Sequence, residues 1–136
     1  MRVDQLNVIV QDMDAAVDFY RRLGFEVPDT LPEWQPHHRT VTSGDGFDVD
    51  LDSPDFAMTW GGVDRGVVIG VRTSEREAVD ERYEALTAAG YEVLKAPYDA
   101  FFGARIAVVR DRDGNTYAVM SPIDEAYRTA SPEPPS

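Results

Sequence analysis

Alternating apolar and polar side chains at the start of the chain predict a β-strand over residues 3–10. From Asp12 the spacing changes, because apolar residues recur three and four positions apart as far as Leu23, which is the period of a helix with one buried face. Asp12 suits the N-cap of this helix, and Gly24 suits the position just after its end. The chain therefore opens with a strand followed by an amphipathic helix.

The same order of elements returns in the second half of the chain. Residues 45–54 (DGFDVDLDSP) match residues 113–122 (DGNTYAVMSP), and residues 24–27 (GFEV) match residues 90–93 (GYEV). The matches keep their order at nearly the same spacing, so we interpret the two halves as copies of one unit. Each copy is predicted to contain a strand, a helix and three further strands (βαβββ).

The two copies define the domain organisation. We place them at residues 1–54 and 66–122, joined by an irregular linker at residues 55–65, with residues 123–136 as a C-terminal tail. A chain of 136 residues has the length of a single domain, so both copies must share one core. Residues 74–77 have the pattern of a capping box, which predicts that the helix of the second copy begins there.

Composition and charge narrow the classes of partner. The formal net charge of −12 argues against nucleic acids and anionic lipid surfaces, since both are bound mainly through Lys and Arg. No apolar run approaches the roughly 20 residues that cross a bilayer, and the N-terminus has no signal-like apolar segment, so we expect a cytoplasmic protein without membrane contact. Cysteine is absent, which excludes disulfides, thiolate metal ligands and a cysteine nucleophile. We expect a small molecule as the ligand.

Four segments carry a resemblance to a known family: residues 6–13 (LNVIVQDM), 16–25 (AVDFYRRLGF), 102–105 (FGAR) and 110–115 (RDRDGN). Together they resemble the vicinal oxygen chelate superfamily, which includes glyoxalase I, extradiol dioxygenases and bleomycin resistance proteins, over about residues 2–122. The resemblance implies an α+β fold in which two βαβββ modules form a curved mixed sheet, with the helices on its outer face and a ligand pocket in the cup. It also implies a homodimer.

Enzymes of that superfamily usually hold a divalent metal through four side chains, one on the first and one on the last strand of each module. The resemblance puts these positions at Gln5, at Gly66 or Val67, at Asp50 and at Ala118. Only Gln5 and Asp50 carry donor atoms, whereas a catalytic metal generally needs about three protein ligands. We therefore expect no metal and no other cofactor in the cup.

Three carboxylates are the most prominent candidates for chemistry. Asp48, Asp50 and Asp52 alternate with Val49 and Leu51, so they share one face of a strand, and we expect that face to line the cup. Asp50 lies in mid-strand and is the candidate for ligand contact or for a general base. Asp48 and Asp52 lie near the strand ends, where solvation is the simpler interpretation.

Histidine and aromatic residues are the other candidates. His37 and His38 are adjacent on an extended segment and point to opposite faces, so they are poorly placed to bind one metal, although either could contact a ligand or lie at the surface. Trp34 and Trp60 lie in segments expected to be irregular, where an aromatic ring can either stack on a ligand or cover the core edge. The predicted ligand-contacting residues are Gln5, Asn7, Trp34, His38, Asp48, Asp50, Trp60, Phe102 and Ala118.

Three functional hypotheses follow. The first is a glyoxalase- or bleomycin-resistance-like protein that binds a small aromatic or cationic molecule in a metal-free cup, for sequestration or resistance. The second is a metal-dependent lyase, isomerase or dioxygenase of the same superfamily, for which Gln5 and Asp50 need further ligands. The third is an enzyme without a cofactor, in which Asp50 is a general base with a raised pKa. The incomplete ligand set favours the first.

Overall fold

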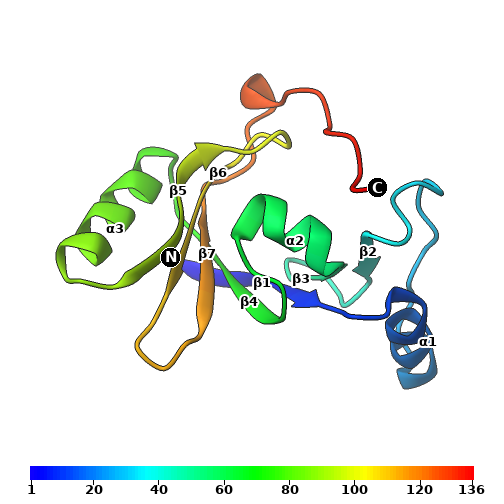
Figure 1. Ribbon diagram of the computed structural model, residues 1–136. Coiled ribbons are helices and arrows are strands. Elements are labelled where there is room, and N and C mark those ends of the chain that lie inside the picture. Colours follow the sequence, from blue (N-terminus) through cyan, green and yellow to red (C-terminus); the bar gives the residue numbers. More distant parts are fainter.

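The computed structural model describes residues 1–136 and contains one seven-stranded sheet with three α-helices (Figure 1). The strands are β1 (Arg2–Ile9), β2 (His38–Val41), β3 (Asp48–Asp52), β4 (Gly66–Arg72), β5 (Glu92–Asp99), β6 (Arg105–Arg110) and β7 (Thr116–Met120). The helices are α1 (Met13–Leu23), α2 (Pro54–Gly61), α3 (Glu77–Ala88) and the short 3₁₀-helix η1 (Glu125–Tyr127). No helix is both long enough and apolar enough to span a membrane.

The order of strands in the sheet is β2-β3-β1-β4-β7-β6-β5, which confirms the α+β fold built from two repeated modules. In each module the last strand lies parallel to the first, as β3 does to β1 and β7 does to β4. The modules join where β1 and β4 pair in antiparallel orientation. In the first module the strand expected directly after the helix is reduced to a single bridge between Glu26 and Thr42, because the turn-forming segment from Pro28 to Pro36 follows at once.

Helices α1 and α3 cover the outer face of the sheet, at opposite ends of it (Figure 1). A buried cluster of five hydrophobic residues lies between α1 and the sheet of the first module, namely Met13, Val17, Val27, Val41 and Leu51. On the second module, Asp80 of α3 accepts hydrogen bonds of 2.6 and 2.9 Å from Arg105. The side chain of Arg105 points away from the face on which Ile106 lies, since neighbours on a strand alternate. The outer placement of these two helices confirms the expected architecture.

Helix α2 lies on the inner face, and it corrects the expectation of an irregular linker at residues 55–65. Ser53 is its N-cap and accepts a hydrogen bond of 3.2 Å from the backbone N–H of Phe56, and Pro54 follows at the first helical position. Both are typical signals for a helix start. Phe56, Met58 and Trp60 therefore lie on a helix rather than in a loop.

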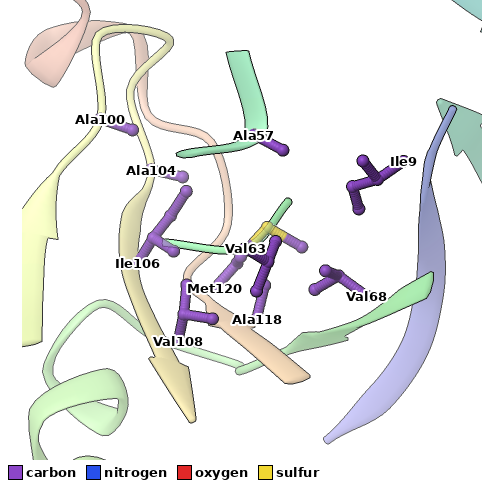
Figure 2. Close-up of a cluster of buried hydrophobic side chains, with 10 residues drawn as sticks. All are labelled: Ile9, Ala57, Val63, Val68, Ala100, Ala104, Ile106, Val108, Ala118 and Met120. Atoms are coloured by element: carbon purple, nitrogen blue, oxygen red, sulfur yellow. The ribbon is translucent and has the colours of Figure 1, made fainter. Parts of the chain in front are cut away.

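The inner face of the second module is a packed hydrophobic core beneath α2 (Figure 2). Ala57 of α2 faces side chains of β4, β6 and β7 in this view. The core consists of Ile9, Ala57, Val63, Val68, Ala100, Ala104, Ile106, Val108, Ala118 and Met120. Helix α2 and the residues after it pack onto this half of the cup, while the strands of the first module carry polar side chains on the inner face.

The predicted signals are confirmed for α1, whereas α3 begins within the predicted segment but without the predicted capping box. The Asp12 side chain accepts a hydrogen bond of 3.0 Å from the backbone N–H of Ala15, and Gly24 has the left-handed φ of 114° that a helix end requires. Helix α3 begins at Glu77 without any side-chain cap. The Thr73 hydroxyl instead donates 2.7 Å to the carbonyl oxygen of Glu75, which orders the turn before the helix in place of a capping box.

Candidate functional site

A chain of hydrogen-bonded polar side chains lies on the inner face of the first module. The pairing register puts Gln5 beside Asp48, Asn7 beside Asp50, and Ile9 beside Asp52. All three aspartates of β3 therefore share a face with the polar residues of β1, as the alternation predicts. Strand β2 borders β3 on the other side and adds His38 and Thr40 to the same face, because they pair with Asp52 and Asp50.

Asp52 is fully buried, which contradicts the expectation that it is solvated at a strand end. Its side chain is 0% exposed, and both of its oxygens have partners. Oδ1 lies 2.6 Å from Nδ1 of His38, and Oδ2 accepts a hydrogen bond of 2.8 Å from Nδ2 of Asn7. Asp52 pairs with Ile9 of β1 on one side and with His38 of β2 on the other.

This contact determines the tautomer of His38. Since Asp52 is an acceptor on both oxygens, Nδ1 of His38 carries the proton, and Nε2 has a free lone pair when the ring is neutral. The side chain of His38 is 37% exposed, and only its Nδ1 makes a hydrogen bond within the chain. Burial lowers the pKa of His38, but the hydrogen bond to Asp52 and the charges of Asp52 and Asp50 outweigh it, and the pKa is raised overall.

Asp50 is partly buried and incompletely satisfied. Its Oδ2 accepts from Nε2 of Gln5 at 3.3 Å and its Oδ1 accepts from the Thr40 hydroxyl at 3.2 Å, both long for hydrogen bonds to a carboxylate. Burial raises the pKa of Asp50 to about 6. His38 and Thr40 oppose this rise, while Asp52 and Asp48 add to it. A carboxylate in this setting can accept further hydrogen bonds or hold a proton near neutral pH.

Gln5 is held in place by its neighbours on the inner face. Its Nε2 also donates 2.7 Å to Oδ1 of Asn7, which links the Asp50 and Asp52 parts of the chain of hydrogen bonds. On the adjacent strand, Gly70 leaves room for it: a Cβ atom at that position would lie 2.7 Å from Cβ of Gln5 and 2.9 Å from Cε of Met120. Gly70 is therefore required by close packing.

An aromatic group borders the site next to His38. The ring of Phe56 lies 5.7 Å from the His38 ring and 5.1 Å from the Trp34 ring, edge to face in both cases. Phe56 belongs to α2, so the helix contributes both to the inner core and to the edge of the polar site. His37 points elsewhere, with Nδ1 2.8 Å from the hydroxyl of Ser53.

The structure thus brings together some of the predicted contact residues and separates others from them. Gln5, Asn7, His38 and Asp50 form one network, and Trp34 reaches it through Phe56. Asp48 lies on the same face but is exposed, with no side-chain partner. Trp60 and Phe102 pack against the inner hydrophobic core, and Ala118 is 1% exposed within it. Sequence reasoning missed Thr40 and the roles of Asp52.

The paired modules and the single sheet that joins them define a class of duplicated α+β proteins. The family model described as Glyoxalase/Bleomycin resistance protein/Dioxygenase superfamily matches residues 2–119, and the chain belongs to this superfamily. No curated protein sequence matches it.

Solved structures with the same fold resemble the chain over most of its length. A glyoxalase/bleomycin resistance protein/dioxygenase superfamily member from Vibrio splendidus matches with a TM-score of 0.62 and 22% identity, covering 88% of this chain and 97% of that one. A Legionella pneumophila protein described as an NAD-dependent benzaldehyde dehydrogenase matches with a TM-score of 0.64 and 15% identity, covering 86% and 96%. A hypothetical protein from Bacillus halodurans matches with a TM-score of 0.57 and 16% identity, covering 91% of this chain and 96% of that one. At these identities the likeness concerns the fold alone.

The residues of this chain do not fit the four-ligand metal site of superfamily enzymes. The strand register makes Val68 the counterpart of Gln5, since Gln5 pairs with Asp48 and Val68 pairs with Thr116 at the repeated position. This corrects the expectation that the second-module counterpart of Gln5 is Gly66 or Val67. Val68 and Ala118 are each 1% exposed in the inner core and have no side-chain donor atom. No group of three or more His, Cys, Asp or Glu residues is arranged to hold a metal ion.

Proposed function

We propose that this chain binds a small organic molecule that carries a cationic, hydrogen-bond-donating group, and that the group is held by Asp50 without a metal. The observation that carries the proposal is the state of the Asp50 carboxylate, which is partly buried yet has only two long hydrogen bonds, of 3.2 and 3.3 Å. Removing a carboxylate from water is costly unless donors or a cation replace the water. A ligand with a protonated nitrogen supplies both.

The charge around the site supports a cation in particular. Three carboxylates, those of Asp48, Asp50 and Asp52, share this face of β3. The whole chain carries a net charge of −12, and a face lined by one sign of charge raises the local concentration of the opposite sign. His38, which is a cation only when its ring is protonated, is already engaged by Asp52 at 2.6 Å.

The aromatic border supports a ligand with a flat ring. Trp34 and Phe56 pack edge to face beside His38, and such rings can contact a planar cation through their faces or edges. A protonated aromatic amine or amidine therefore matches both parts of the site. Sequestration of such a molecule needs shape and charge complementarity but no catalytic group, so the proposed role is that of a binding or resistance protein.

Tryptophan fluorescence with a matched pair of probes tests this proposal. Benzamidine and benzoate have the same ring and opposite charge, so we expect benzamidine to quench the emission of the Trp60→Phe variant, which retains Trp34, while benzoate does not. The Asp50→Asn variant should bind benzamidine about tenfold more weakly, the loss of one charged hydrogen bond. Asp55→Asn, an exposed site on α2, is the control of equal charge change. Equal binding of both probes, or unchanged binding in Asp50→Asn, would show the proposal to be wrong.

A second candidate function, metal-free proton transfer, is favoured by the contact between Asp52 and His38. A buried carboxylate that fixes the Nδ1–H tautomer leaves Nε2 as a proton acceptor, which is the arrangement of a general base. In this candidate His38 accepts the proton of the bound ligand, with Asp50 beside it.

An activated ester tests whether Nε2 of His38 is reactive. Hydrolysis of p-nitrophenyl acetate should fall in His38→Gln and in Asp52→Asn and remain unchanged in His37→Gln, because His37 is held by Ser53 and not by a buried carboxylate. Equal rates in the wild type and in His38→Gln would rule this candidate out and leave the binding role unaffected.

A further inference from the structure

A separate cavity lies at the other end of the sheet, between the start of β1, the end of β4 and the segment that follows β7. It is widely open to solvent, and its volume of about 520 Å³ is large enough for a small molecule. Arg72 lies on the same face of β4 as Gly70, so the cavity opens on the inner face. The close packing of Gln5 and Met120 around Gly70 separates it from Asp50.

The wall of this cavity holds a buried carboxylate with one oxygen unpaired. The Asp4 side chain is only 9% exposed, and its Oδ2 accepts a hydrogen bond of 3.0 Å from Nε of Arg72. Its Oδ1 is buried and has no hydrogen-bond partner in the protein. Leaving such an acceptor unpaired costs about 1–3 kcal/mol. A donor from outside the chain would therefore be favoured at this oxygen.

Arg72 offers the complementary group. Its side chain is 13% exposed, Nε is occupied by Asp4, and Nη1 donates 2.7 Å to the carbonyl oxygen of Ser121. Nη2 makes no hydrogen bond to the protein and is not among its fully buried polar atoms, so it is open to a ligand. Arg2 adds a second guanidinium 3.5 Å from Asp4. Two guanidinium groups against one carboxylate give a net positive site in a strongly acidic protein, which favours an anion.

The remaining walls include apolar side chains. Ile123 is 53% exposed, and together with Pro122 it lines the same cavity as the charged residues of β1 and β4. An aliphatic group of a ligand would bury apolar surface there, with a gain of about 25 cal/mol per Å².

We propose that this cavity is a second binding site, for a small α-hydroxy or α-amino carboxylic acid with an aliphatic side chain. The carboxylate pairs with Nη2 of Arg72, and the adjacent hydroxyl or ammonium group donates to Oδ1 of Asp4. Because Oδ1 is buried in the structure, the proposal requires the Asp4 carboxylate to rotate about its last torsion so that Oδ1 reaches the ligand. The aliphatic part lies against Pro122 and Ile123. This site is independent of the proposed cation site at Asp50.

Four probes of matched carbon skeleton test the assignment by titration of the ¹⁵N-labelled protein. They are 2-hydroxy-4-methylpentanoate, L-leucine, 4-methylpentanoate, which lacks the donor, and 3-methylbutylamine, which lacks the carboxylate. We expect the hydroxy acid or the amino acid to shift the amide signals of Thr73 and Ser74 at millimolar concentrations and to leave that of Thr40 in place. The acid without the donor should bind about tenfold more weakly, as the loss of one hydrogen bond to a charged group predicts. The amine should not bind.

Variants then locate the contacts. Arg72→Lys keeps the charge but removes the Nη atoms, and it should weaken binding about tenfold, whereas Arg65→Lys, at an exposed ion pair with Asp64, should not. If Arg72→Lys does not fold, the proposal is tested by the wild-type protein alone, through the difference in affinity between 2-hydroxy-4-methylpentanoate and 4-methylpentanoate. Absence of shifts at Thr73 and Ser74 with all four probes, or equal binding of all four, would overturn the proposal. The distinction between hydroxy acid and amino acid tells which donor the site accepts.

Discussion

Replacing Asp50 by Asn should stabilise the protein at alkaline pH, because the ionised carboxylate lowers the stability of the fold. The pKa of Asp50 rises from its ordinary value of 3.8 to about 6 on folding, chiefly through burial. Each pKa unit corresponds to about 1.4 kcal/mol, so the ionised form costs up to about 3 kcal/mol of unfolding free energy. The side chain is partly exposed and Asn must reorient Gln5 or Thr40, so we expect a net gain of about 1–2 kcal/mol.

The pH dependence distinguishes this effect from a change in packing. A raised carboxyl pKa means that the folded protein binds the proton more tightly than the unfolded chain does. Protonated Asp50 therefore favours the folded state most below about pH 4, and this stabilisation is lost as the pH rises to about 6. Urea unfolding of the wild type and of Asp50→Asn should give nearly equal stabilities at about pH 4 and a more stable variant at about pH 8. A variant that is less stable than the wild type at about pH 8 would refute the reasoning.

Three further changes test the local structure. Asp52→Asn removes the charge that raises the pKa of His38, so NMR titration of the His38 ring should give a lower pKa in the variant, and an unchanged value would contradict the assigned contact. Gly70→Ala places a Cβ atom 2.7 Å from that of Gln5 and should cost about 1–3 kcal/mol in urea unfolding, whereas an unaffected stability would mean that the two strands are less closely packed. Asp12→Ala removes the N-cap of α1 and should lower the free energy of unfolding by about 1 kcal/mol in the same measurement. Asp14→Ala, in the first turn of the helix, removes a carboxylate that makes no capping hydrogen bond and should lower it less.

The repeat made most of the fold predictable from the sequence. Residues 45–54 and 113–122 match because each contains the last strand of a module, and both strands lie parallel to the first strand of their own module. Local signals also predicted α1, whose cap residue and glycine end are confirmed. Helix α2 was missed because its stabilisation comes from the inner core, a long-range contact, while its local signals are confined to its two ends, Ser53–Pro54 and Gly62.

The candidate site was predictable only in part, because its central contact depends on strand register. The alternation of Asp48, Asp50 and Asp52 predicts a shared face, and the register confirms it. The contact between His38 and Asp52 needs in addition the antiparallel pairing of β2 with β3 in one particular register. No periodicity within either strand reports that pairing, so the burial of Asp52 was not expected from its position near a strand end.

The second module indicates that the polar residues of the first are not required by the fold. The pairing registers relate each polar residue of the site to an uncharged counterpart in the second module: Gln5 to Val68, Asn7 to Gly70, His38 to Ile106, Thr40 to Val108, Asp50 to Ala118 and Asp52 to Met120. Five of these six counterparts belong to the hydrophobic core beneath α2. The same backbone positions therefore accept apolar side chains and gain from burying them. Polar groups kept at such positions cost stability unless they are paired. The duplicated sheet buries one inner face as hydrophobic core and keeps hydrogen-bonded carboxylates and an imidazole on the other. This difference between the two halves is the physical basis for seeking the ligand at Asp50 and His38.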